Sequence, residues 1–369
     1  MDLKSRTMSV SYKTPSPARH TLAPCHFKAR NINANGGAVK AFGILRHGTS
    51  AELRQLELPV PKPGPFEVLV RVVCSSVNPA DIRARAPSAQ RVIARTFPLV
   101  LGYDVSGVVE SVGKCATRFA PGDEVFGSPS LKGQGANAEL VLVDERSLQP
   151  KPRDMSHAEA AALSLAGVTA LECLERAQSI THARRLLIHA GAGGVGHLQL
   201  QLARALGFEV WATAGSDASV AACKRFGADK VCDYREQDFV QACRDEAGAG
   251  GMPIIMDNVG GDVFARSMDA LAPLGVLVSI VPTQTPVAGQ LFPKAASLVY
   301  HVMGAESLWA IDPGSQGRAL GRVVQLALQH GIRAHVSHRW PVRDLALAHA
   351  QIESGRTIGK VVIDVQDGW

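Results

Sequence analysis

Residues 189–196 read HAGAGGVG and place four glycines in eight positions. Each glycine gives up more backbone entropy on folding than any other residue, and none has a side chain to pack. A segment that accepts this cost indicates that something must approach its backbone closely.

Short apolar segments alternate with segments of helical pattern around this octapeptide. Expected strands cover 183–190, 209–214, 230–234, 253–259 and 275–281, and expected helices cover 194–206, 217–226, 237–247 and 262–272. Strands joined through helices predict right-handed crossovers and a parallel sheet. The strands are apolar on both faces, which is typical of a sheet covered by helices on both sides.

The glycines of the octapeptide fit the pattern G-x-G-x-x-G at Gly191, Gly193 and Gly196. The pattern follows an expected strand and opens an expected helix, which is the context of a dinucleotide-binding loop. Gly191 is expected to make the tight turn, Gly193 to leave room for a diphosphate, and Gly196 to let the helix pack closely. Gly194 and Val195 complete the loop at a helix N-terminus, which favours anions. The alternative is a tight structural turn without a ligand.

The identity of the dinucleotide depends on the tip of the second expected strand. NAD sites place an acidic residue about twenty positions after the first glycine, but residues 211–216 read WATAGS. The missing carboxylate favours NADP, with Ser216, Lys224, Arg225 and Tyr234 as candidates to receive the 2′-phosphate. For Lys224 or Arg225, a solvated helix face is the alternative.

The part of the chain before residue 150 is mostly β, with expected strands at 66–74, 104–112, 124–127 and 138–143. Ser156 and Glu159 have the spacing of a capping box and predict the start of a helix. Near the C-terminal end, residues 315–332 form an amphipathic helical pattern, with Ser315 as the expected cap and Gly331 as the stop signal.

From residue 38 onward the chain resembles the medium-chain dehydrogenase/reductase superfamily and, more narrowly, its zinc-independent quinone oxidoreductase family. The resemblance is carried by VNPADIRAR (77–85), FPLVLGYDVSGVVESVG (97–113), FAPGDEVFG (119–127), AAALSLAGVTALECL (160–174), HAGAGGVG (189–196), FGADKVCDYRE (226–236), MDNVGG (256–261) and GKVVIDV (359–365).

The resemblance implies an α/β fold in which a GroES-like, β-rich catalytic domain accompanies a Rossmann domain with a doubly wound parallel sheet. The implied boundaries are a disordered tail at 1–37, the catalytic domain at 38–160 and the NADP-binding domain at 161–305. Residues 306–369 would form a linking helix and strands that return to the catalytic domain.

Relatives that bind zinc carry a cysteine early in the β-rich domain and a Gly-His-Glu in a later turn. This sequence has Asn78 in the first region and Tyr103–Asp104 in the second, so the thiolate and imidazole that zinc favours are missing. Cys74 lies in an expected strand and is interpreted as a core residue. We therefore expect no metal, and hydride transfer to an acceptor that is already electrophilic.

The resemblance also assigns roles to single residues. It places Asn78 near the nicotinamide and the substrate as the catalytic candidate, and Thr169 at the nicotinamide end of the cofactor. It places Asn258 and Lys360 in the cofactor site, although Lys360 on the surface is the alternative. Asp81 is expected to be structural, with Arg85 as a possible partner. NADPH-using relatives carry a lysine where this chain has Ala221, so Ser216, Lys224 or Tyr234 would have to compensate.

Composition narrows the partners. Hydrophobic residues make up 46% of the chain and charged residues 20%, an ordinary globular balance. The first 36 residues carry a net charge of +5 out of +6, so the remaining body has no basic stripe and we expect no nucleic-acid partner. No apolar run is long enough to predict a membrane span. The apolar residues around 275–305 favour a homodimer, or else line the substrate cleft.

The cysteines and the tail bear on location. Seven scattered cysteines without a C-x-x-C pair indicate a reducing compartment, and we expect a cytoplasmic protein. The tail is rich in basic and hydroxyl residues like a mitochondrial transit peptide, but Pro15, Pro17 and Pro24 interrupt any helix there. Mitochondrial import is therefore the alternative to a disordered extension.

Together these features predict an NADPH-dependent oxidoreductase that transfers hydride to a quinone or an α,β-unsaturated carbonyl without zinc. Two alternatives remain open at this point. One is an enoyl-thioester reductase, which uses the same hydride step. The other is a protein of the same fold that binds the cofactor without catalysis.

Overall fold

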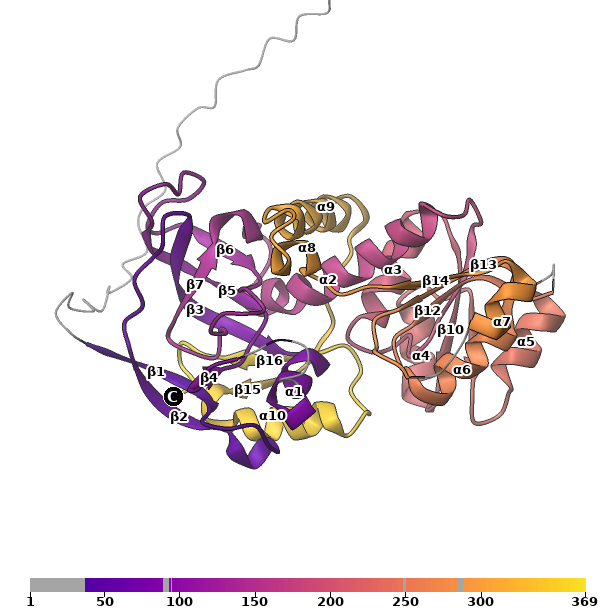
Figure 1. Ribbon diagram of the computed structural model, residues 1–369, viewed down its shortest axis with the longest axis horizontal. Coiled ribbons are helices and arrows are strands. Elements are labelled where there is room, and N and C mark those ends of the chain that lie inside the picture. Colours follow the sequence, from indigo (N-terminus) through magenta and orange to yellow (C-terminus); the bar gives the residue numbers. More distant parts are fainter. Residues whose placement is uncertain (1–36, 89–92, 94, 248–249, 285–287) are drawn as a thin grey trace, which may run out of the picture. The chain divides into compact units, whose positions relative to one another are not determined.

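Hydrogen bonding between strands sorts the chain into three sheets in the computed structural model, which describes residues 37–88, 93, 95–247, 250–284 and 288–369. Nearly all of the expected tail at 1–37 lies outside the described residues. Figure 1 shows the arrangement of the elements along the chain.

A six-stranded sheet contains the octapeptide, and all of its neighbouring strands are parallel. Its order is β11 (Lys230–Asp233), β10 (Glu209–Ala214), β9 (Arg185–Ile188), β12 (Met252–Asp257), β13 (Leu271–Ser279) and β14 (Ser297–Tyr300). The strand order reverses between β9 and β12. Doubly wound folds bind ligands at such a switch point, outside the carboxyl ends of the strands. The expected α/β class and parallel sheet are confirmed.

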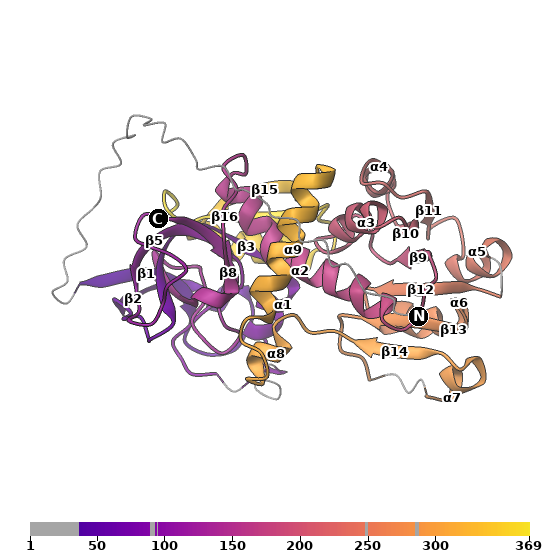
Figure 2. The same ribbon diagram turned by 90° about the horizontal axis from the view of Figure 1, so that it is seen from above.

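Alternate residues of these strands pack into two separate cores, which is why the strands read as apolar throughout. In β10, Val210 and Ala212 belong to one core and Trp211 to the other. The first core also takes residues from α2 (His157–Gln178), α3 (Gly196–Ala205) and α4 (Asp217–Arg225). The second takes residues from α5 (Phe239–Glu246) and α6 (Gly261–Ala270). Helices therefore cover both faces of the sheet, as Figure 2 shows from above.

The β-rich part of the chain is built on a second, mostly antiparallel sheet. It has the order β15 (Val336–Pro341), β16 (Lys360–Asp364), β3 (Glu67–Val77), β5 (Val105–Val112), β6 (Glu124–Gly127) and β8 (Leu148–Pro150), and β7 (Leu140–Asp144) also pairs with β3. A third sheet joins β2 (Arg54–Pro59), β1 (Ala38–Ile44) and β4 (Leu99–Val100). The last strands of the chain thus pair with an early one, Val361 lying opposite Val77. The domain boundaries proposed above stay a prediction.

Two helix termini test the sequence reading directly. The capping box at α2 is confirmed, because Ser156 Oγ accepts the Glu159 N–H at 3.2 Å and Glu159 Oε2 accepts the Ser156 N–H at 3.1 Å. The expectation for Ser315 is wrong: it is the first residue of α9 (Ser315–His330), and Gly314 precedes it as the cap. Gly331 ends α9 at φ 68°, as predicted.

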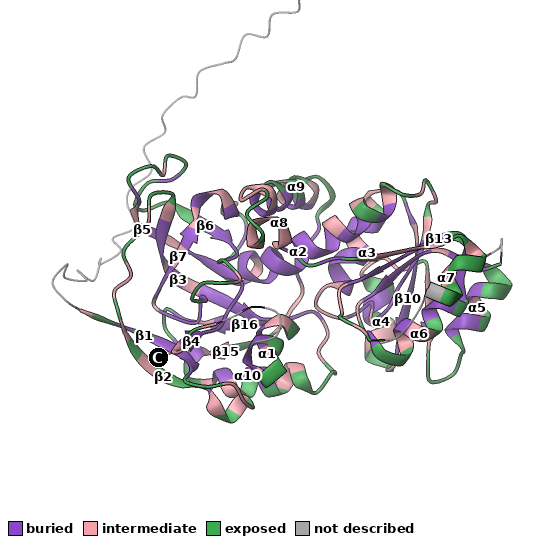
Figure 3. Ribbon diagram, viewed as in Figure 1, coloured by how far each residue is buried: buried purple, intermediate pink, exposed green. Residues whose placement is uncertain are grey.

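The remaining α-helices of the described residues are α1 (Pro79–Arg85), α7 (Ala288–Leu291), α8 (Ala305–Leu308) and α10 (Leu345–Glu353). Figure 3 shows that burial follows the strands, while exposed segments lie on the outer helices and turns. None of the helices within the described ranges combines the length and apolarity needed to cross a membrane.

Candidate active site

The glycine-rich loop leads from β9 into α3, and its turn is made differently from the prediction. Ala190, not Gly191, takes the left-handed conformation, with φ at 51°. Gly191 is required for packing instead, because a Cβ on it would lie 2.7 Å from the Ala212 Cβ and 3.0 Å from the Cys223 Sγ. Gly196 keeps its predicted role, since a Cβ there would lie 2.2 Å from the Ala190 carbonyl oxygen.

The outer side of the loop is open. A Cβ on Gly193 would meet only Ala190, at 3.1 Å or more, and Gly193, Gly194 and Val195 are all half-buried. Among the described residues no side chain caps the first turn of α3. Small residues beside a helix N-terminus fit the diphosphate of a dinucleotide. The arrangement therefore suits the predicted cofactor.

Two groups hold this loop against the end of the chain. The Gly359 N–H donates to the Ala192 carbonyl oxygen at 2.8 Å. His197, buried in α3, contacts the Gly193 carbonyl oxygen through Nδ1 at 2.9 Å and accepts the His335 N–H at Nε2 at 3.0 Å. These contacts assign the proton to Nδ1. Burial lowers the pKa of His197 to about 4, so the ring stays neutral near pH 7.

Two of the candidates for the 2′-phosphate, Ser216 and Tyr234, lie at the tip of β10, where the Tyr234 N–H donates to the Ala214 carbonyl oxygen at 3.0 Å. Ser216 caps α4 by accepting the Ser219 N–H at 3.2 Å. The Tyr234 ring covers Gly215, where a Cβ would lie 1.9 Å from the ring, yet 62% of Tyr234 stays exposed. An exposed hydroxyl and a phenol at this tip are therefore available to a ribose or its phosphate.

Arg235 lies at the same tip, and the sequence reasoning missed it. Its Nη2 donates to Asp217 Oδ1 at 2.7 Å and to Asp233 Oδ2 at 2.5 Å. Asp217 is thus the ion-pair partner of Arg235 and not the cap of α4. The signal was present, since Arg235 directly follows the nominated Tyr234.

Lys224 is not part of this group, which corrects its candidacy. It lies in the last turn of α4, seven residues after its first residue, so about 10 Å along the helix axis from the strand tip. The chain next to it bonds back to the amino end of β10, since the Asp229 N–H donates to the Val210 carbonyl oxygen. Lys224 is exposed on a solvated face of α4, which is the alternative interpretation given above.

Lys360 joins the loop to the β-rich sheet and is buried, so the surface reading of this residue is wrong. Its stem packs 3.5 Å from the position of a Cβ on Gly194. Its Nζ donates to Asn78 Oδ1 and lies 3.4 Å from Asp104 Oδ2. Lys360 is 2% exposed and Asp104 0%, so this is a buried ion pair.

Asp104 is the centre of this cluster. Asn78 Nδ2 and the Leu165 N–H each donate to it at 2.7 Å, and the Ser76 hydroxyl donates as well. Asn78 and Lys360, 282 residues apart in sequence, are thereby fixed on one carboxylate. The catalytic candidate is held in place at the side of the glycine-rich loop.

Asp81 and Arg85 behave differently from each other. Asp81 is structural as predicted, accepting the Asn78 and Gly102 N–H groups at 2.8 and 2.9 Å, and burial raises its pKa to about 6. The expected partner of Arg85 is wrong, because Arg85 pairs with Glu353 at 2.5 Å.

The residues at the position of the zinc ligands do not fit zinc. Asn78 and Asp104 direct oxygens at the Lys360 ammonium, and burial raises the pKa of the neighbouring Cys74 thiol to about 12. Zinc prefers thiolate and imidazole ligands. The described residues also hold no group of three His, Cys, Asp or Glu side chains that could bind a metal.

The two remaining candidates for cofactor binding, Thr169 and Asn258, lie in α2 and directly after β12. Thr169, buried in α2, donates its hydroxyl to the Leu165 carbonyl oxygen at 2.8 Å, one turn from the residue that binds Asp104. Asn258 follows β12, and its Nδ2 donates to the His189 carbonyl oxygen at 2.9 Å and to Gln199 Oε1 at 2.8 Å. Its Oδ1 is buried without a hydrogen-bond partner among the described residues, which leaves an acceptor at the switch point.

The chain is similar to known dehydrogenases and reductases. The family model for the alcohol dehydrogenase GroES-like domain matches residues 64–153, and the model for zinc-binding dehydrogenases matches residues 226–363. The quinone oxidoreductase of Pseudomonas aeruginosa is 30% identical over 306 residues, which cover 82% of this chain and 92% of that protein. The 2-haloacrylate reductase of a Burkholderia species is 29% identical over 318 residues, covering 83% and 93%.

Solved structures extend the likeness to the fold. A mycobacterial protein solved in complex with NADPH superposes with a TM-score of 0.79 at 28% identity, covering 88% of this chain and 99% of that one. The matches support an oxidoreductase activity. The chain belongs to the medium-chain dehydrogenase/reductase superfamily and, within it, to the quinone oxidoreductase-like family.

Proposed function

We propose that this protein is an NADPH-dependent reductase that delivers hydride to a quinone or an α,β-unsaturated carbonyl and uses no zinc. One observation carries the proposal. Beside the open glycine-rich loop, the Lys360 ammonium lies between Asn78 Oδ1 and Asp104 Oδ2, at the place where zinc relatives keep their ligands.

The nature of that cluster favours one class of acceptor. A metal ion acts as a Lewis acid on an alcohol or carbonyl oxygen, whereas here a buried carboxylate and amide are committed to a lysine. An acceptor that is already electrophilic, such as a quinone or enone, needs no such activation. Two relatives are named for acceptors of this kind, namely the quinone oxidoreductase and the 2-haloacrylate reductase.

Bound NADPH would supply the hydride, and the chain would supply binding and orientation. Gly193, Gly194 and the first turn of α3 would hold the diphosphate. Ser216 and Tyr234 would contact the adenosine ribose, and Arg235 would exchange Asp217 for the 2′-phosphate, because a guanidinium binds phosphate oxygens with charge-assisted hydrogen bonds. Thr169 and Asn258 would lie toward the nicotinamide half, on the far side of the switch point.

The test is oxidation of NADPH and of NADH by the purified protein against a panel of quinones, alkenals and enoyl thioesters, with and without a chelator. We expect NADPH to be oxidised with small quinones or enones, and the chelator to have no effect. Activity confined to enoyl thioesters would instead support the enoyl-thioester reductase. Tight NADPH binding without turnover of any acceptor would support the non-catalytic protein.

We also propose the predicted homodimer, formed through β14. This strand is the edge of the parallel sheet, and an edge presents unpaired backbone groups to another chain. Tyr300, its last residue, and the nearby Phe292 and Val302 are exposed large hydrophobic residues. Sedimentation analysis should give twice the chain mass, and a monomer at micromolar concentration would contradict this.

A further inference from the structure

A buried histidine without a hydrogen-bond partner stands at the end of β14. The His301 side chain is 2% exposed, and neither ring nitrogen has a hydrogen-bond partner among the described residues. Nε2 lies 3.2 Å from Glu172 Oε2, which is ion-pair distance without hydrogen-bond alignment. Buried polar groups are normally paired, so these ring nitrogens are available to hydrogen-bond a bound molecule.

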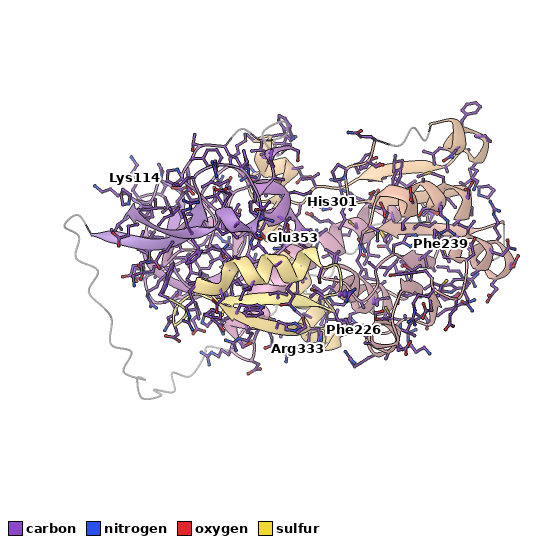
Figure 4. All side chains as sticks on the ribbon, turned by 90° about the horizontal axis from the view of Figure 1, so that it is seen from below. Lys114, Phe226, Phe239, His301, Arg333 and Glu353 are labelled. Atoms are coloured by element: carbon purple, nitrogen blue, oxygen red, sulfur yellow. The ribbon has the colours of Figure 1, made fainter. Side chains whose placement is uncertain are left out.

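His301 lies at the edge of the sheet where the cofactor site was assigned. Its N–H donates to the carbonyl oxygen of Ser279, the last residue of β13, at 2.9 Å. Ser279 Oγ in turn donates to Asp257 Oδ2, at the end of β12, at 2.7 Å. β12 and β13 are the strands on the nicotinamide side of the switch point. Figure 4 labels His301 where the chain leaves the parallel sheet.

Helix α2 links His301 to the catalytic cluster. The Leu165 N–H binds Asp104, Thr169 follows four residues later, and Glu172 three residues after that. Residues spaced by four and three share one face of a helix. The face of α2 that begins at the Asn78–Asp104–Lys360 cluster therefore continues through Thr169 to Glu172 and His301.

We infer that His301 is the proton donor to the reduced substrate, with Glu172 as the residue that positions it. The inference rests on the proposed reductase function. For an enone, bound NADPH would supply the hydride for the new C–H bond at the β-carbon and leave as NADP⁺, and the C=C electron pair would move into an enolate. The proton on the His301 imidazolium then forms the C–H bond at the α-carbon, and the ring becomes neutral.

Glu172 completes the cycle from the solvent side. Its side chain is 20% exposed, in contrast to the 2% of His301, so it reaches both water and the ring. Glu172 is thereby placed to relay a proton from water to the ring. The net reaction consumes one NADPH, one proton and one enone, and yields NADP⁺ and the saturated carbonyl.

The acceptor decides how much this proton matters. An enolate is strongly basic and needs a proton at carbon, whereas the hydroquinone anion of an electron-poor quinone is stable at neutral pH. General acid catalysis contributes roughly 10² to 10⁴ in rate. We therefore expect His301→Gln to lower kcat for an enone by about 100-fold or more, and kcat for an electron-poor benzoquinone by a factor at least tenfold smaller.

Three further variants make the test decisive. Glu172→Gln should lower enone turnover less than His301→Gln does. It should also enlarge the solvent deuterium isotope effect on enone turnover, which a structural role of Glu172 would not do. His301→Ala should regain part of its enone turnover with added imidazole. His182→Gln, at an exposed histidine, is the matched control and should behave like wild type. If His301→Gln does not fold, as judged by circular dichroism, the Glu172→Gln isotope effect carries the test.

The possible failures are distinguishable. Equal losses with both acceptors, or no loss with either, would overturn the role of His301 while leaving the reductase function in place. If none of the acceptors supports NADPH oxidation by the wild-type protein, the reductase function itself is overturned.

Discussion

Removing the charge of Lys360 should reveal how much the buried ion pair contributes to the fold. Lys360→Met keeps the length of the side chain but leaves Asp104, fully buried, without its cation. Leaving one member of a buried pair uncompensated typically costs about 3–5 kcal/mol. Three donors remain on Asp104, from Ser76, Asn78 and Leu165, so we expect the lower end, about 3 kcal/mol of unfolding free energy.

Urea unfolding followed by circular dichroism measures this change. Lys114→Met, at an exposed lysine labelled in Figure 4, is the control and should stay within about 0.5 kcal/mol of wild type. Adding Asp104→Asn to Lys360→Met removes the orphaned charge and should recover most of the loss, because the pair is coupled. A loss below about 1 kcal/mol in Lys360→Met would refute the buried pair and the anchoring of Asn78 argued from it.

Three other predictions follow from single contacts. Gly193→Val should weaken NADPH binding by about 100-fold, or 2.7 kcal/mol, as measured by fluorescence titration, and equal affinity would contradict the loop assignment. Its melting temperature should fall less than that of Gly196→Ala, because the new Cβ would lie 3.1 Å from the Ala190 oxygen in the first variant and 2.2 Å in the second. The pKa of His197 is about 4 in the folded state and about 6.5 in the unfolded state. The unfolded state therefore binds more protons between these pH values, and the free energy of unfolding should fall as the pH drops from 7 to 4. The urea midpoints at pH 7.5 and pH 5.0 should differ less in His197→Gln than in wild type, and an unchanged difference would contradict the neutral ring. Arg235→Ala should raise the Kd for NADPH about tenfold more than that for NADH, and parallel losses for both would show that Arg235 does not receive the 2′-phosphate.

The sheet could be predicted because it depends on local patterns. Apolar runs such as 209–214, separated by helical segments, fix a parallel sheet, and β10 begins and ends where the pattern placed it. The capping box at Ser156 is likewise a four-residue signal, and the structure confirms it. The prediction for Ser315 failed because α9 begins at Ser315 itself, after Gly314, and no side chain makes the capping hydrogen bond there.

The site could be predicted only where its residues are close in sequence. Tyr234 lies over Gly215, the residue before Ser216, because β10 and β11 are neighbours in the sheet. The burial of Lys360 depends on β16 pairing with β3, across nearly the whole chain, and no local pattern contains that contact. The partner of Arg85 is similarly distant, at Glu353. Lys224 was misplaced because nearness in sequence to the strand tip does not account for the length of α4.

Transfer of label from the cofactor to the product tests the central claim most directly. The protein is incubated with an enone and with NADPH carrying deuterium at the 4R or the 4S position of the dihydronicotinamide, and the product is analysed by mass spectrometry. Direct hydride transfer predicts one deuterium at the β-carbon of the product from one of the two labelled cofactors and none from the other. Product formed without deuterium from either cofactor, or no product from any enone or quinone, would contradict the account.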